Sequence, residues 1–172
     1  MSGSLAAPSL SEPLAAWLVD ALDDPGPFTL TRLSGGNSNE TLLLESPAAR
    51  RIMRRPPAAA VDPGAHNMAR EHRVLAALHG AGAPVPRPLA LCEDLSVAPA
   101  VFLVMEMIDG HAVNDRLPAA YPPGADTVRA MGEAVVDALA NVHLVDWQAA
   151  GLGDFGRPDG FLQRQVPRWR SQ

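Results

Sequence analysis

The chain has 172 residues, of which 47% are hydrophobic and 19% charged, and its formal net charge is −5. This composition argues against a disordered chain, and the negative charge against a general binder of nucleic acid or anionic membranes. A single cysteine, Cys92, excludes an internal disulfide framework. Since no signal peptide and no apolar run of about 20 residues is present, we expect a cytoplasmic globular protein that does not enter a membrane.

The first half of the chain changes from a helical to an extended pattern. Residues 1–10 are expected to form a flexible arm. Apolar residues then recur at helical spacing and predict a helix over 11–22. Three strands are predicted next, at 28–33, 41–45 and 50–55, with a glycine-rich loop at 34–39 and an irregular connection at 58–64.

The second half of the chain begins with a helix and ends with helices. We expect a helix over 65–79, followed by strands at 89–92 and 101–107 that are joined by a hairpin-like loop. The remaining segments are predicted to be a loop-rich stretch at 112–125, a helix at 126–145, a glycine-rich loop at 151–160 and the start of another helix at 161–172.

The order of these elements predicts an α+β fold. Five antiparallel strands with one helix inserted after the third strand form the small lobe of a protein-kinase-like fold. We therefore divide the chain into a kinase-like N-lobe at 11–107, a hinge at 108–111 and an incomplete helical C-lobe at 112–172. The apolar stripe of the 126–145 helix would then need cover, so we expect self-association through Val128, Met131, Val135 and Leu139 or a longer parent protein.

The glycine-rich loop between the first two strands is a candidate phosphate-binding loop. Glycine allows a backbone to approach closely, so N–H groups of this loop could lie over the phosphates of a nucleotide. Ser38 and Asn39 could add side-chain donors, and the full candidate set is Gly35, Gly36, Asn37, Ser38 and Asn39. The loop matches neither the P-loop nor the GxGxxG pattern, and a plain β-turn is the alternative.

Arg54 and Glu71 are the candidate pair behind that loop. In kinase-like folds the third strand carries a basic residue that holds phosphates, and a helix carboxylate holds that residue in place. This chain contains no lysine, so arginine or another group must take the place of a phosphate-binding lysine. The alternatives are an exposed strand arginine, with Arg55 equally placed, and a solvated carboxylate between Arg70 and Arg73.

Two further segments are candidates at the sequence level. The stretch Met105-Glu106-Met107 ends the fifth strand, where backbone groups of Glu106 and Met107 could meet an adenine edge; packing of the methionines in the core is the alternative. The tripeptide Asp154-Phe155-Gly156 spells a kinase metal motif. No catalytic loop precedes it, so a glycine-flanked loop is the preferred interpretation.

These residues together resemble the aminoglycoside phosphotransferase family, and within it the phosphotransferase domains of acyl-CoA dehydrogenase fusion proteins. The resemblance covers most of the chain from residue 28 onward. The matching stretches are Gly36–Thr41, Ile52–Pro57, Ala65-His66, Arg70–Leu75, Pro84–Pro88, Leu91–Asp94, Phe102–Met107, Leu139–His143 and Gly151–Pro158, with Arg164, Gln165 and Trp169.

The resemblance implies binding of ATP with Mg²⁺ and phosphorylation of a small-molecule hydroxyl, with hydroxyacyl-CoA or aminoglycoside-like compounds as acceptors. The family's catalytic His-Gly-Asp loop and its later magnesium-binding Asp do not occur here. We expect both beyond residue 172, so this chain alone should be inactive, with no catalytic or metal residue of its own. The alternatives are a non-catalytic nucleotide-binding or structural module, and a fragment completed by a partner chain.

Overall fold

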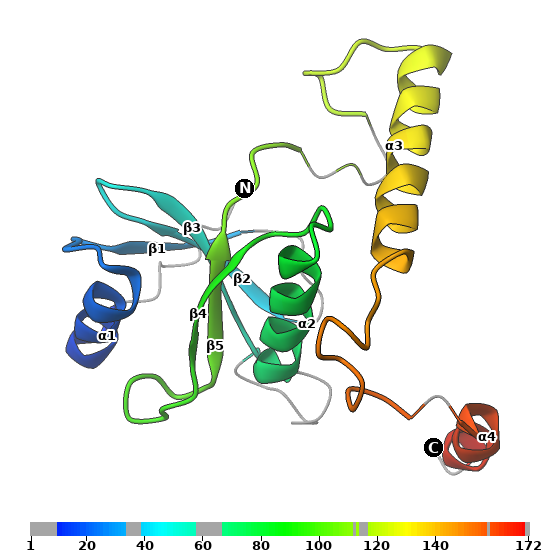
Figure 1. Ribbon diagram of the computed structural model, residues 1–172. Helices are drawn as coiled ribbons and strands as arrows, with labels where there is room; N and C mark the ends of the chain where they lie inside the picture. Colours follow the sequence, from blue (N-terminus) through cyan, green and yellow to red (C-terminus); the bar gives the residue numbers. More distant parts are fainter. Residues whose placement is uncertain are drawn as a thin grey trace.

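The computed structural model of the chain describes residues 10–33, 39–57, 67–111, 113, 117–157 and 159–170. Its strands form two groups along the chain, three after the first helix and two after the second, and two more helices follow (Figure 1). In chain order they are α1 (Glu12–Leu22), β1 (Thr29–Arg32), β2 (Glu40–Glu45), β3 (Arg50–Arg55), α2 (Met68–Gly80), β4 (Pro88–Cys92), β5 (Phe102–Glu106), α3 (Ala125–His143) and α4 (Phe161–Arg170).

The five strands form one antiparallel sheet in the order β1-β2-β3-β5-β4. Helix α2 lies between β3 and β4 in the chain. In the sheet, β5 lies between β3 and β4. This is the α+β, kinase-like arrangement that the sequence predicted, and its five strands fall within two residues of the expected positions.

One face of the sheet packs against α1 and forms the main core. Side chains alternate between the faces of a strand, so Leu42 and Leu44 of β2 point to the same side. They pack with Leu14 and Leu18 of α1 and with Phe102 of β5. Helix α1 begins where the hydroxyl of its N-cap, Ser11, accepts a hydrogen bond from the backbone of Leu14 at 3.4 Å.

Helix α2 lies on the opposite face of the sheet from α1 (Figure 1). Its start at Met68 corrects the predicted start at Ala65. The side-chain oxygen of Asn67 accepts a hydrogen bond from the backbone N–H of Arg70 at 2.8 Å, so Asn67 is the N-cap. An N-cap residue has an extended backbone, and the helix cannot include it.

The last two helices extend away from the sheet (Figure 1). Helix α3 ends at His143, two residues before the predicted end, and contains no buried residue. The apolar stripe that the sequence predicted is uncovered, with Val135 67% exposed. Val128 and Leu139 are also exposed, and Met131 is half-buried. None of the helices in the described ranges is long and apolar enough to cross a membrane.

Candidate functional site

Arg54 of β3 and Glu71 of α2 form an ion pair on the α2 face of the sheet. Nη1 of Arg54 donates to Oε1 of Glu71 over 2.5 Å, and the two side chains are 30% and 23% exposed. The sequence predicted this pairing, because the residue lies on the third strand and the carboxylate in the first turns of the next helix. The pair fixes the direction in which Arg54 points.

Arg55 points to the other face, since neighbouring residues of a strand alternate. Its Nε donates to Oε2 of Glu40 at 2.8 Å, and Arg32 lies 3.4 Å from the other oxygen of the same carboxylate. The two arginines that the sequence could not distinguish therefore have different surroundings. Arg54 is the one that faces the inserted helix.

The guanidinium of Arg54 keeps donors beyond the one that Glu71 uses. Its Nε is buried, and no hydrogen-bond acceptor among the described residues reaches it. A cavity of about 530 Å³ opens beside the pair, and its lining residues are Arg54, Asn67, Arg70, Glu71, Val74, Leu75 and Phe155. A buried donor without a partner beside open space is a position where an anionic ligand could complete the hydrogen bonding.

Two rows of side chains cross the α2 face of the sheet. Strand register places Thr41, Arg54 and Leu103 in one row. The neighbouring row on the same face contains three apolar residues side by side, Leu43, Ile52 and Met105. Successive side chains on one face of a strand are about 7 Å apart, so the apolar row lies directly beside the arginine.

Leu43 and Ile52 are additions to the site residues expected from the sequence. The signal that could have found Ile52 is its spacing, because it lies two positions before Arg54 and must share its face. Leu43 is found only from the register between β2 and β3.

Most of the predicted glycine-rich loop, including Gly35, Gly36, Asn37 and Ser38, lies outside the described residues. Its two ends are described. The backbone N–H of Leu33 donates to the carbonyl of Thr41 at 2.9 Å, and Asn39 is buried at the start of β2. Since Thr41 is also the register partner of Arg54, the loop leaves and re-enters the sheet at the end where Arg54 lies.

The stretch Met105-Glu106-Met107, whose backbone groups are candidates for an adenine edge, lies at the end of β5. The backbone N–H of Glu106 already donates to the carbonyl of Arg87 at 2.9 Å. The side chain of Glu106 lines a different cleft, of about 310 Å³, together with Leu22 of α1, Arg50 and Arg51. The side chain of Glu106 therefore lies on the opposite face of the sheet from Arg54. Met107, the next residue, is half-buried at the end of β5.

Asp154, in the tripeptide that spells a kinase metal motif, lies in a turn and forms an ion pair with Arg73 of α2. This is the glycine-flanked loop that the sequence favoured. Within the described ranges, no group of three or more His, Cys, Asp or Glu side chains could hold a metal ion.

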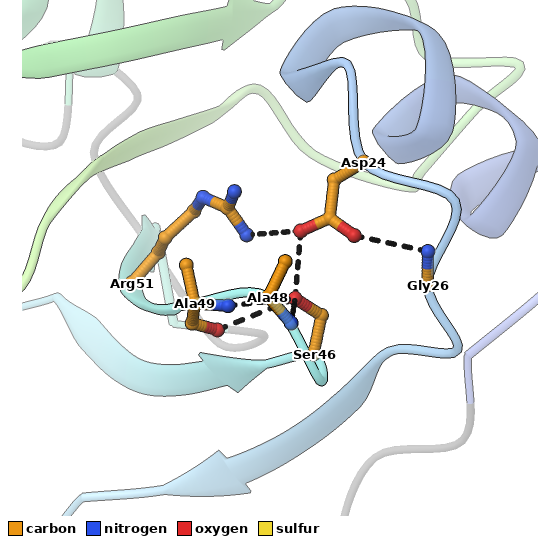
Figure 2. Close-up of polar contacts among 6 residues, drawn as sticks. All are labelled: Asp24, Gly26, Ser46, Ala48, Ala49 and Arg51. Atoms are coloured by element: carbon orange, nitrogen blue, oxygen red, sulfur yellow. Dashed lines mark hydrogen bonds and ion pairs between the residues drawn. The ribbon is translucent and has the colours of Figure 1, made fainter.

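A second buried polar cluster lies beyond the end of α1 (Figure 2). Asp24 is 2% exposed, and its carboxylate accepts hydrogen bonds from Ser46 at 2.6 Å, Arg51 at 2.7 Å and the backbone of Gly26 at 3.0 Å. The hydroxyl of Ser46, the guanidinium of Arg51 and the Gly26 N–H hold the pKa of Asp24 below its usual range, although burial opposes them. The cluster joins α1 to the β2–β3 hairpin, and its saturated hydrogen bonding indicates a structural role.

Comparisons with known proteins agree with the kinase-like fold. The sequence pattern that defines the phosphotransferase enzyme family (APH) matches residues 29–172. The chain is 34% identical to acyl-CoA dehydrogenase family member 11 of Gallus gallus over 147 residues, which are 86% of this chain and 18% of that protein. It is also 34% identical to acyl-CoA dehydrogenase family member 10 of Mus musculus over 148 residues, or 86% of this chain and 14% of the relative.

A solved structure from Ralstonia eutropha JMP134, assigned as an aminoglycoside phosphotransferase, is similar to the chain with a TM-score of 0.73 and 35% identity. The match covers 93% of this chain and 46% of the solved one. The chain thus spans less than half of that structure and less than a fifth of the two acyl-CoA dehydrogenase family proteins.

Proposed function

The chain belongs to the phosphotransferase enzyme family, and we propose that it forms the nucleotide-binding part of an ATP-dependent kinase. This kinase phosphorylates a hydroxyl group of a small molecule. The observation that carries the proposal is the Arg54–Glu71 pair, with a buried Nε of Arg54 left over beside a cavity. In kinase-like folds, a basic residue held by a helix carboxylate is the arrangement that positions phosphates.

The proposed site divides into a polar and an apolar part. The phosphates lie at the Arg54 row, where the donors that Glu71 leaves over can bind phosphate oxygens. The adenine packs against the row of Leu43, Ile52 and Met105, and backbone groups after Glu106 bind its edge. Bound Mg²⁺ would neutralise charge on the phosphates, while the described residues of this chain hold and orient the nucleotide.

The chemical class of the acceptor is proposed from the relatives alone. Because the sequence relatives are named acyl-CoA dehydrogenase family members and the solved structure is assigned as an aminoglycoside phosphotransferase, we propose a hydroxyacyl-CoA or an aminoglycoside-like alcohol as the acceptor class. The sequence contains no His-Gly-Asp tripeptide, which resemblance to the family identifies as the catalytic loop. We therefore propose that this chain by itself binds ATP without transferring phosphate, and a non-catalytic nucleotide-binding module is the second candidate.

Titration calorimetry of ATP with Mg²⁺ into the 172-residue chain tests the proposal. Arg54→Ala should weaken ATP binding by about 1.5–3 kcal/mol, or about ten- to 150-fold, because it removes hydrogen bonds to a charged ligand. Arg55→Ala is the matched control, since the residue is adjacent but faces Glu40 on the other side of the sheet. Equal affinity of wild type and Arg54→Ala would show that this arginine does not bind the nucleotide.

A further inference from the structure

A short turn far along the chain is attached to helix α2. The 151–157 turn, as we call residues 151–157, contacts α2 through two arginines three positions apart. Arg73 donates to the carbonyl of Gly151 at 2.7 Å and to the carboxylate of Asp154. Arg70 donates to the carbonyl of Phe155 at 3.1 Å, and its guanidinium carbon lies 3.6 Å from the centre of the Phe155 ring.

These contacts hold the turn of α2 that carries Glu71. Residues three apart lie on the same face of a helix, so Arg70 and Arg73 reach the 151–157 turn together. Glu71 lies between them in sequence and reaches Arg54 of the sheet. The same short stretch of helix therefore contacts the 151–157 turn on one side and the proposed phosphate-binding arginine on another.

Helix α2 is packed mainly by half-buried residues. It lies against β4 and β5, but Met68 is its only buried residue, and the rest of the helix is half-buried or exposed. A helix packed in this way is less firmly fixed than a fully buried one, so contacts on its exposed side can influence its position. A shift of α2 would change the reach of Glu71, and hence the direction in which Arg54 points.

The attachment of the turn is a combination of contacts rather than one ion pair. Asp154 is 77% exposed, and an isolated surface ion pair contributes little. Here the guanidinium of Arg73 contacts a carboxylate and a carbonyl together, and the hydrogen bond that it donates holds the pKa of Asp154 below its usual range. The stacking of Arg70 on Phe155 adds a cation–π contact.

We propose that the 151–157 turn positions helix α2 so that Glu71 orients Arg54 for the phosphates. Arg70, Arg73, Asp154 and Phe155 are then positioning residues for nucleotide binding, which act through Glu71. Phe155 also lines the cavity beside Arg54 and Glu71, which brings the turn to the edge of the site. This inference rests on the proposed function, because it gives the turn a role in binding ATP.

The test is a double-mutant cycle on ATP affinity, measured by calorimetry with the 172-residue chain. Asp154→Ala should weaken ATP binding by about three- to tenfold. In a Glu71→Gln background the same substitution should have no further effect, because the residue through which it acts is already disabled. Asp137→Ala, on the exposed surface of α3, is the control and should bind ATP like the wild type.

A charge exchange tests whether the effect depends on the ion pair between Arg73 and Asp154. Arg73→Asp should weaken ATP binding, and the double variant Arg73→Asp with Asp154→Arg should restore most of it. Unchanged affinity in Asp154→Ala, or an equal loss with and without Glu71, would overturn the proposal.

Amide hydrogen exchange without nucleotide separates this proposal from the function on which it rests. If the wild type binds no ATP, the proposed function fails, but faster exchange of α2 amides in Asp154→Ala would still support the attachment of the helix by the turn. Unchanged exchange along α2 would overturn that attachment as well.

Discussion

At the scale of single residues, the use of arginine in place of lysine has a physical consequence. A guanidinium has five N–H donors in a rigid plane, whereas an ammonium is a compact point charge. Arg54 can therefore donate to Glu71 over 2.5 Å and keep further donors for a ligand. The ion pair with Glu71 therefore leaves part of the hydrogen-bonding capacity of Arg54 unused, which is what the proposed nucleotide site requires.

Asp24 leads to a prediction about the pH dependence of stability. Hydrogen bonds from Ser46, Gly26 and Arg51 favour its carboxylate, so its pKa is lower in the folded chain than in the unfolded one. The stabilisation is thus fully present above the unfolded pKa of about 4 and is lost as the pH falls toward the lower folded value. Asp24→Asn should lower Tm at pH 7, and the difference from wild type should shrink below about pH 4.

Thermal melts of both proteins between pH 7 and pH 3 measure this effect. Asp20→Asn is a matched control, because Asp20 is exposed on α1. A Tm difference for Asp24→Asn that stays constant down to pH 3 would show that the carboxylate charge does not stabilise the cluster.

At the scale of elements, α1 acts as the cover of one sheet face. Leu18 has no exposed surface and packs with Leu42, Leu44 and Phe102. Leu18→Ala should destabilise the chain by about 2–5 kcal/mol, since it leaves a cavity in the core. The neighbouring residue Val19 is 42% exposed, and Val19→Ala should change stability by less than about 0.5 kcal/mol.

Urea denaturation of the two variants gives these free energies of unfolding. A loss below about 1 kcal/mol in Leu18→Ala would mean that α1 is not an integral part of the core.

The strands could be predicted from the sequence because each is a short segment between stretches that contain glycine, proline or other turn residues. The pairing of Arg54 with Glu71 was predicted from the order of the third strand and the following helix. The partners of Arg70 and Arg73 could not be predicted, since Asp154 is 81 residues from Arg73 and no local pattern joins them. The N-cap of α2 at Asn67 was missed, although asparagine is a favoured N-cap residue.

At the scale of the whole molecule, the exposed stripe of α3 predicts association. Val128, Val135 and Leu139 lie on a helix without a buried residue, and a soluble monomer rarely exposes such a patch. We propose that the isolated chain associates with second copies through this stripe. Light scattering should show oligomers of the wild type. The variant with Val135→Glu and Leu139→Glu should have a lower mass in solution, because the charges prevent association through the stripe.

A compact wild-type monomer with a cooperative melt would contradict this proposal, because the stripe would then be tolerated in water. The substitution Asp137→Asn, on the same helix but outside the stripe, controls for a general effect of altered charge on α3.

The most direct test of ATP binding on the α2 face of the sheet is amide hydrogen exchange of the chain with and without ATP. Bound ATP should slow exchange in the described residues around Thr41, Ile52–Arg54 and Met105–Ile108. Exchange that is unchanged by ATP, or slowed only around Arg50 and Arg87 in the cleft on the α1 side, would contradict it.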